Sequence, residues 1–298
     1  MDSKSTSSIK VDVYQIVTDR IIELLEAGTI PWQKPWTTPE VPMNLISKRP
    51  YRGINFWLLH SLQYPRNLFL TWDQIKTINA SVKRGETGTV IVFWKNVKKQ
   101  PEELDELGQP KMAPLLRYYK VFNVDQCRDV PENLVEPVSV NEHKPIEECE
   151  SIIKSMKQCP PIKHEVQQAF YDPQKDYINM PKKKSFKDIE SYYHTLFHEL
   201  VHSTGHEKRL GRKSVTDMAE FGSEMYSLEE LIAELGAAFL SGKTRILNVG
   251  IRNSTAYISG WLTKLKSDKK LLVHASTFSQ KAVDFILNLQ LSEAHKEF

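Results

Sequence analysis

Apolar and polar positions along the chain follow two periods, which predict a mixture of helices and strands. Apolar residues recur at helical spacing over residues 9–27, and Gly28 follows the last turn. Residues 89–94 and 115–124 instead alternate as strands, and we expect them to pair with each other. Between them, residues 98–114 carry charge and turn-forming residues without periodicity, which indicates an exposed hairpin insertion.

The second half of the chain is dominated by helical periodicity. Helices are expected at residues 146–157, 227–240, 253–266 and 275–291. Two short strands are expected at 169–171 and 177–180, joined by a turn. The pattern therefore predicts an α+β protein with a mixed α/β N-terminal part and a mostly helical C-terminal part with a small β-sheet.

The length of the chain and a proline-rich segment predict two domains. A chain of 298 residues is long for a single core. Residues 131–145 include three prolines among polar and acidic residues, which is typical of a linker. We expect an N-terminal domain at residues 1–130 and a C-terminal domain at residues 146–298.

One segment carries a recognisable chemical motif, His198-Glu-Leu-Val-His202. On a helix, His198 and His202 lie one turn apart on the same face, so both imidazoles can bind one Zn²⁺ ion. Glu199 beside them can take a proton from a water on the metal, which makes it the candidate catalytic base. Gly205 is placed to end this helix just past its last turn.

A catalytic zinc site needs a third protein ligand. The extended metzincin motif fails, because Lys208 stands where its last histidine would be. The helix at 227–240 offers Glu230 as the ligand and Glu234, one turn on, as a residue that orients a ligating histidine. A shift of one residue would make Glu229 the ligand instead. Zinc is the ion expected first, with manganese or another divalent ion as alternatives.

The composition argues against a membrane protein, a secreted protein and a disulfide-rich protein. No apolar run approaches the ~20 residues that span a bilayer, and the first residues lack the apolar core of a signal peptide. The three cysteines form no C-x-x-C pair, so neither a disulfide framework nor a thiolate zinc site is indicated. We therefore expect a cytoplasmic protein without a membrane partner.

The net charge of +3 is unevenly distributed along the chain, because one segment is strongly basic. Residues 30–100 hold eleven Lys and Arg against three acidic residues, together with five of the six tryptophans. Basic side chains neutralise phosphates, and unpaired bases stack on aromatic faces, so this composition favours single-stranded nucleic acid. Trp57 and Trp94, inside regular elements, are expected in the core. The residues predicted to contact DNA are Trp32, Lys34, Trp36, Lys48, Arg49, Tyr51, Arg52, Lys83 and Arg84.

These motifs together resemble the ArdC-type antirestriction proteins of conjugative plasmids. The resemblance rests on Pro31-Trp-Gln-Lys-Pro-Trp36, Tyr51-Arg-Gly-Ile-Asn55, Lys83-Arg-Gly-Glu86, the segment 198–206 and the segment 229–238. It implies an N-terminal domain that binds single-stranded DNA and a C-terminal zincin-like metallopeptidase domain. It further implies protection of incoming plasmid DNA from host restriction during conjugation.

Three functions remain open at this point. The first is a single-strand-binding antirestriction protein with a competent zinc-dependent peptidase site. The second is a binding and protection protein whose metal is structural. The third is a cytosolic zinc metallopeptidase acting on a protein substrate, such as a component of the restriction system, with the basic N-terminal domain as a targeting module.

Overall fold

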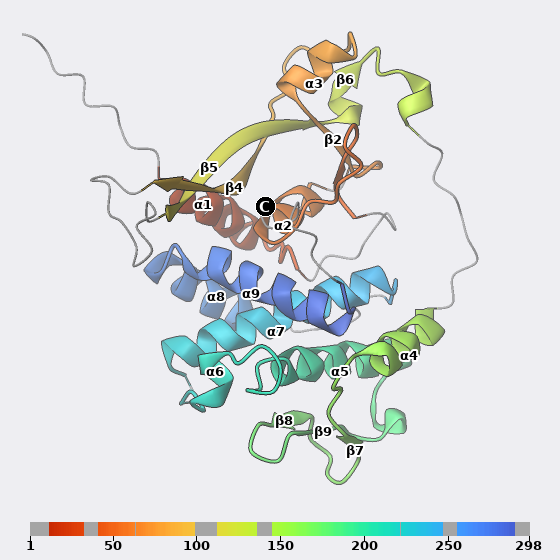
Figure 1. Ribbon diagram of the computed structural model, residues 1–298, viewed down its shortest axis with the longest axis vertical. Helices are drawn as coiled ribbons and strands as arrows, with labels where there is room; N and C mark the ends of the chain where they lie inside the picture. Colours follow the sequence, from red (N-terminus) through yellow and green to blue (C-terminus); the bar gives the residue numbers. More distant parts are fainter. Residues whose placement is uncertain are drawn as a thin grey trace, which may run out of the picture.

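The computed structural model describes residues 12–32, 41–62, 64–98, 112–135, 145–220, 222–246 and 255–289. Figure 1 shows α3 and the arched strand β5 at one end, a stack of helices in the middle and the small sheet β7–β9 at the other end. The predicted α+β class is confirmed, with a mixed N-terminal part and a mostly helical C-terminal part.

The N-terminal part is built around a long hairpin. Its elements are α1 (Val13–Glu26), β1 (Met43–Asn44), α2 (Ile54–His60), β2 (Leu68–Thr71), α3 (Trp72–Thr77), β3 (Ser81–Val82), β4 (Thr89–Lys98), β5 (Met112–Asn123), the 3₁₀ turns Val124–Gln126 and Glu132–Leu134, and β6 (Cys127–Arg128). The predicted pairing is confirmed, since β4 and β5 run antiparallel in the sheet order β1-β2-β5-β4. The insertion predicted between them falls mostly on residues 99–111, outside the described residues.

The C-terminal part consists mainly of packed helices. Its elements are α4 (Pro145–Ser155), β7 (Ile162–Lys163), β8 (Phe170–Asp172), β9 (Tyr177–Asn179), the 3₁₀ turn Lys183–Ser185, α5 (Ile189–Ser203), α6 (Lys213–Thr216), α7 (Glu224–Lys243), α8 (Thr255–Ser267) and α9 (Leu271–Ile286). Helix α7 packs against α5 on one side and α9 on the other. The small sheet has the order β7-β9-β8. Strands β8 and β9 are predicted from the sequence, and β7 is an additional strand that pairs with β9.

Side chains from both ends of the chain meet in one hydrophobic core. Val17 and Ile21 of α1 share it with Leu231 of α7 and Leu272 of α9, all at most 1% exposed. Each side chain of this size contributes about 1.5–3 kcal/mol when buried. Helix α1 packs on α8 while α2 contacts both β4 and α9, so these helices join the hairpin to the C-terminal helices (Figure 1).

A largely buried ion pair also joins the two parts. The Arg52 guanidinium donates to the carboxylate of Asp284 on α9, and their side chains are 16% and 7% exposed. Beside it, the backbone N–H of Gly53 donates to the side chain of Gln280 over 3.0 Å. The loop before α2 is therefore fixed to α9 by polar contacts as well as by the core.

Membrane insertion of a helix finds no support in the part of the chain that the structure describes. None of the helices there combines the length and the apolar composition that crossing a bilayer requires.

We expect Arg52→Met to lower the free energy of unfolding by about 3 kcal/mol, because Asp284 would stay buried without its cation. Denaturant titration measures this change. Arg20→Met is the matched control, because the Arg20–Glu23 pair is 48% and 63% exposed and such pairs contribute only ~0.2–1 kcal/mol. Equal losses in the two variants would contradict the structural role of the Arg52–Asp284 pair.

Candidate metal centre

The helix that carries the histidine motif forms where the sequence predicts it. Asp188 caps its first turn by accepting from the backbone N–H of Ser191 over 2.7 Å. Phe197, Leu200 and Val201 form an apolar surface of the helix and are fully buried. His198 and His202 lie toward Glu230 of α7, and Val201 also packs against α7.

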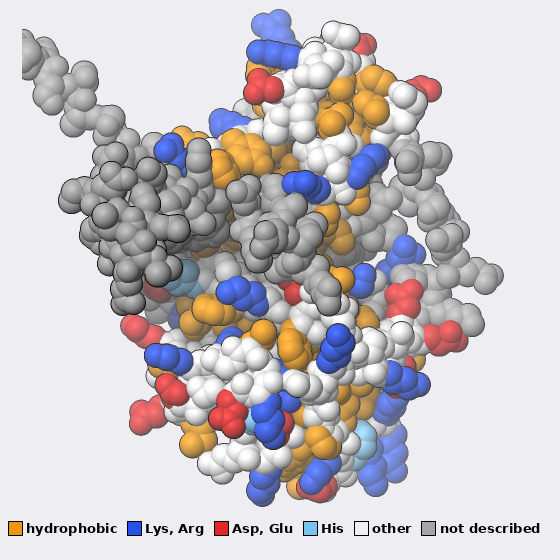
Figure 2. Space-filling model, viewed as in Figure 1, with side chains coloured by type: hydrophobic (Ala, Val, Ile, Leu, Met, Phe, Trp, Pro, Cys, Tyr) orange, Lys and Arg blue, Asp and Glu red, His pale blue; other side chains and the backbone are white. Residues whose placement is uncertain are grey.

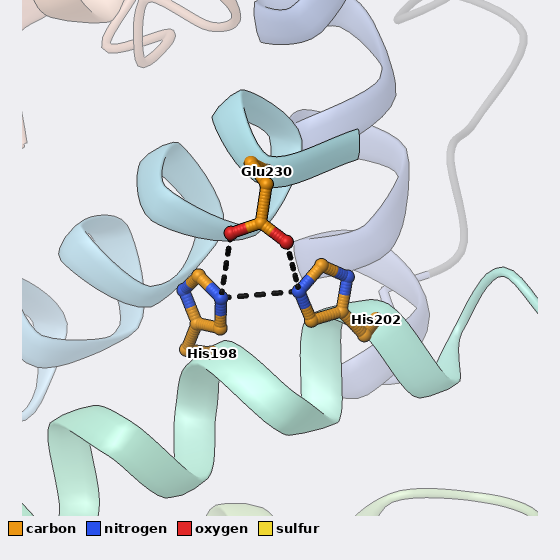
Figure 3. A group of neighbouring side chains, drawn as sticks. All are labelled: His198, His202 and Glu230. Carbon is orange, nitrogen blue, oxygen red and sulfur yellow. Dashed lines mark hydrogen bonds and ion pairs between the residues drawn. The ribbon is translucent and has the colours of Figure 1, made fainter. Parts of the chain in front are cut away.

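Two imidazoles and one carboxylate converge between α5 and α7. The Nε2 atoms of His198 and His202 lie 3.0 Å apart. The carboxylate of Glu230 on α7 spans both rings, with one oxygen 3.7 Å from Nε2 of His198 and the other 3.6 Å from Nε2 of His202 (Figure 3). Ligands held tetrahedrally at about 2.1 Å from a metal lie about 3.4 Å from each other. The donor set therefore fits a divalent metal ion.

The helix register gives the two neighbouring glutamates different surroundings. Glu230 faces the histidine pair, whereas Glu229 is turned toward Arg212 and accepts from both Nε and Nη2 of its guanidinium, at 3.0 and 2.6 Å. The sequence offers Glu229 and Glu230 as alternative third ligands, and Glu230 is the one that lies close to Nε2 of both histidines. Its role as a metal ligand stays a prediction, as do those of His198 and His202.

Glu229 also contacts His202, at the ring nitrogen that does not face the metal group. One of its oxygens lies 3.1 Å from Nδ1 of His202, and the other accepts from the Ser214 hydroxyl over 2.6 Å. When Nδ1 of His202 donates to Glu229, the Nε2 lone pair faces the site, as a metal ligand requires. Burial raises the pKa of Glu229, but hydrogen bonds from His202 and Arg212 and their charges outweigh it and lower that pKa to about 2.

Several carboxylates concentrate negative charge at His198. Burial lowers the pKa of His198, but its contact with the Glu230 carboxylate and the charges of Glu199, Glu234 and Glu230 raise it to about 9. Glu199 itself is buried on α5 and directly follows His198 in the chain. Glu234 adds negative charge near His198, and its role in orienting a histidine stays a prediction. The contact of Glu229 with Nδ1 of His202 is one that sequence reasoning missed.

Two glycines set the spacing of the elements around the site. A Cβ at Gly236 of α7 would lie 2.6 Å from a methyl of Val201 on α5, so the two helices approach closely only with glycine there. Gly205 follows the end of α5 as predicted, but its main role is also close packing. A Cβ there would lie 2.4 Å from the side chain of Val215.

The outer histidines of the motif lie away from the metal group. Nδ1 of His194 lies 2.8 Å from the Ser241 hydroxyl on α7. Nδ1 of His206 accepts from the backbone N–H of Lys208 over 3.2 Å. Both rings are buried, and neither belongs to the group of side chains placed to hold a metal.

Three of the predicted DNA-contact residues have little exposed surface, which argues against direct contact with DNA at these positions. Trp32 is 1% exposed and packs edge-on against Trp261 of α8, with centroids 6.2 Å apart. Tyr51 is 7% exposed and packs edge-on against Phe69, and burial raises its pKa. Arg52 is paired with Asp284, as described above. Their positions in loops favoured exposure, but long-range packing covers them.

The other predicted DNA contacts lie on the surface or outside the described residues. Lys48 and Arg49 are exposed in the turn after β1, and Arg84 is exposed in the turn after β3. Lys83 beside it is half-buried and donates to the backbone carbonyl of Asp125 over 2.7 Å. Lys34 and Trp36 fall outside the described residues. Trp57 is buried as predicted, whereas the side chain of Trp94 is not among those described.

Two stretches of the chain match known families. Residues 11–122 match the N-terminal domain of anti-restriction factor ArdC. Residues 147–278 match a zincin-like metallopeptidase domain, and this range contains His198, His202 and Glu230.

Solved structures resemble the chain over nearly its whole length. The metal-free antirestriction ArdC protein from plasmid R388 is 34% identical, with 94% of this chain and 100% of that chain covered and a TM-score of 0.73. Its Mn(II)-bound form is 32% identical, with 93% and 98% covered and the same TM-score. The Mn(II) form and the donor set found here both support a divalent metal.

Curated relatives include longer proteins. A DNA primase TraC of Escherichia coli is 31% identical over 313 residues, which cover 98% of this chain but 28% of the primase. A second TraC primase is matched over 20% of its length. The uncharacterized protein y4eC of Sinorhizobium fredii (strain NBRC 101917 / NGR234) is 29% identical, with 99% and 98% covered. The chain thus spans about a quarter of the primases that it matches.

We expect Glu229→Gln to weaken divalent-metal binding by about 10- to 100-fold, because the amide no longer holds His202 Nδ1–H as an anion does. Competition with a chelating fluorophore measures the affinity. Glu224→Gln, on an exposed residue of the same helix, should bind metal like the wild type.

Ser214→Ala gives a milder test of the same contact, because it removes a single hydrogen bond to Glu229. It should reduce metal affinity less than Glu229→Gln does. Wild-type metal affinity in a folded Glu229→Gln protein would show that Glu229 does not orient the histidine.

Proposed function

Because the chain belongs to the ArdC antirestriction family, we propose that it binds single-stranded DNA and protects incoming plasmid DNA from host restriction during conjugation. The observation that carries the proposal is the match to the R388 antirestriction protein across the full length of that chain. The basic window of the N-terminal part supports a nucleic-acid partner, since Lys and Arg release counterions when they bind phosphates.

The proposal assigns the two activities to different parts of the chain. Residues 1–130 bind DNA, residues 131–145 connect, and residues 146–298 form the metallopeptidase-like domain. The family matches at 11–122 and 147–278 leave the connecting segment between them, which supports this division. The shared core and the Arg52–Asp284 pair then hold the DNA-binding part at a fixed place on the metal-binding part.

The C-terminal part is proposed to be a competent hydrolytic centre. A divalent ion, when bound, supplies Lewis-acid activation of a water and of a carbonyl oxygen. His198, His202 and Glu230 would hold that ion, and Glu229 would keep the ring of His202 in place. Glu199 would be the base that accepts a proton from water in peptide hydrolysis. Zinc is the ion proposed for this donor set, and manganese is an alternative that the R388 structure supports.

A single-stranded oligonucleotide should bind with an affinity that falls as salt rises. Contact with three phosphates gives a slope of log K against log salt of about −2. Fluorescence anisotropy in a series of salt concentrations measures this slope. A salt-insensitive affinity, or equal affinity for a duplex of the same sequence, would contradict the proposal.

Glu199→Gln separates hydrolysis from binding. The variant should keep its metal and its affinity for DNA, because the amide is the same size and Glu199 lies outside the proposed ligand set. We expect it to lose protection of transferred plasmid, measured as the conjugation frequency into restricting relative to non-restricting recipients. Unchanged protection would show that the protein protects by binding and that the metal is structural. Cleavage of a cellular protein without any DNA binding would favour the metallopeptidase function with a targeting domain.

A further inference from the structure

Trp72 is an exposed tryptophan at the start of α3. Its side chain is 50% exposed, although burial is usual for this residue. The helix start is well fixed, because Thr71 and Gln74 form a reciprocal capping box. Gln74 also exchanges hydrogen bonds of 2.9 and 3.1 Å with Asn44, which holds the turn containing Lys48 and Arg49 against α3.

The indole of Trp72 rests on a supported surface. Phe122 of β5 lies beside it, with ring centroids 5.7 Å apart, and the ammonium of Lys76 lies 5.6 Å from its ring centroid. Gly88 permits this packing, because a Cβ there would lie 2.9 Å from the Phe122 ring and 3.1 Å from the Cβ of Lys120. The Trp72 ring is therefore fixed by its contact with Phe122 while much of its surface stays exposed to solvent.

The same surface continues along β5. Side chains alternate between the two faces of a strand, so Tyr118 and Lys120 share the face of Phe122. Tyr118 is 41% exposed and Lys120 is exposed. Two exposed aromatic rings, Trp72 and Tyr118, thus flank a lysine on one face of the hairpin.

The charge around these rings favours an anionic ligand. Lys76 and Lys120 are exposed beside these rings. Residues 72–98 hold five Lys and Arg against two acidic residues, Asp73 and Glu86. Glu86 already accepts a hydrogen bond from Gln126 over 2.8 Å. Figure 2 shows Lys and Arg side chains, with a few Asp and Glu side chains among them, beside exposed hydrophobic surface over α3 and the arch of β5.

We propose that Trp72, Lys76, Tyr118 and Lys120 form the surface on which single-stranded DNA binds. Two unpaired bases stack on Trp72 and Tyr118, and the two lysines contact the phosphates between them. A duplex cannot bind this way, because its base faces are covered. This inference rests on the proposed single-strand binding, and it places the stacking on α3 and β5 rather than on the buried Trp32 and Tyr51.

Anisotropy titration of a labelled single strand tests this surface. We expect Trp72→Ala and Tyr118→Ala each to weaken binding about 5- to 150-fold, the range measured for loss of one stacked base. Phe278→Ala is the matched control, because Phe278 is 38% exposed in the C-terminal part and Lys281 lies 5.6 Å from its ring. It should bind like the wild type.

Trp72→Phe adds an optical readout. Phenylalanine still stacks, so binding should weaken less than in Trp72→Ala, while most of the tryptophan quenching seen with the wild type should disappear. Lys76→Met should make the salt slope shallower by about 0.7. Because Lys76 and Tyr118 are exposed, their variants test the surface even where Trp72→Ala perturbs folding.

The outcomes separate this inference from the proposed function. A wild-type protein that binds no single strand overturns the proposed function itself. Wild-type binding with undiminished affinity in Trp72→Ala and Tyr118→Ala overturns the inference alone. An equal loss in Phe278→Ala also overturns it, because the effect would then not be specific to this surface.

Discussion

The close packing of α5 against α7 is the constraint on which the metal centre depends. One helix supplies both histidines and the other supplies the carboxylate, so the site exists only at one relative position of the two. Gly236 meets Val201 where they cross, and a side chain there would push the helices apart. Rotation of α7 by one residue, about 100°, would move Glu229 into the place of Glu230 and turn Glu230 away from the histidines.

The buried carboxylate of Glu229 links this packing to the chemistry. An ionised carboxylate inside a protein requires partners, and here Arg212, Ser214 and His202 provide them. Arg212 also donates to the backbone carbonyl of Val201 and to the hydroxyl of Thr204, so the loop after α5 closes back on the helix end. The same network that stabilises the fold therefore determines which nitrogen of His202 faces the metal.

Local sequence was enough for the features that depend on neighbouring residues. The spacing of His198 and His202 and the pairing of β4 with β5 follow from helix and strand geometry. Burial of Trp32 was not predictable in this way, because it depends on Trp261, more than two hundred residues away in the chain. The contact of Glu229 with His202 likewise depends on Arg212 from a loop that shows no periodic pattern.

Helices α5 and α7 together are proposed to bind a single divalent ion through His198, His202 and Glu230, and the chemistry of the C-terminal part depends on that ion. Metal content of the purified protein by mass spectrometry, for the wild type and for His202→Ala, tests it most directly. We expect about one ion per wild-type chain and loss of that ion from a folded His202→Ala protein. Equal metal content in both, or none in the wild type after purification with zinc or manganese present, would contradict it.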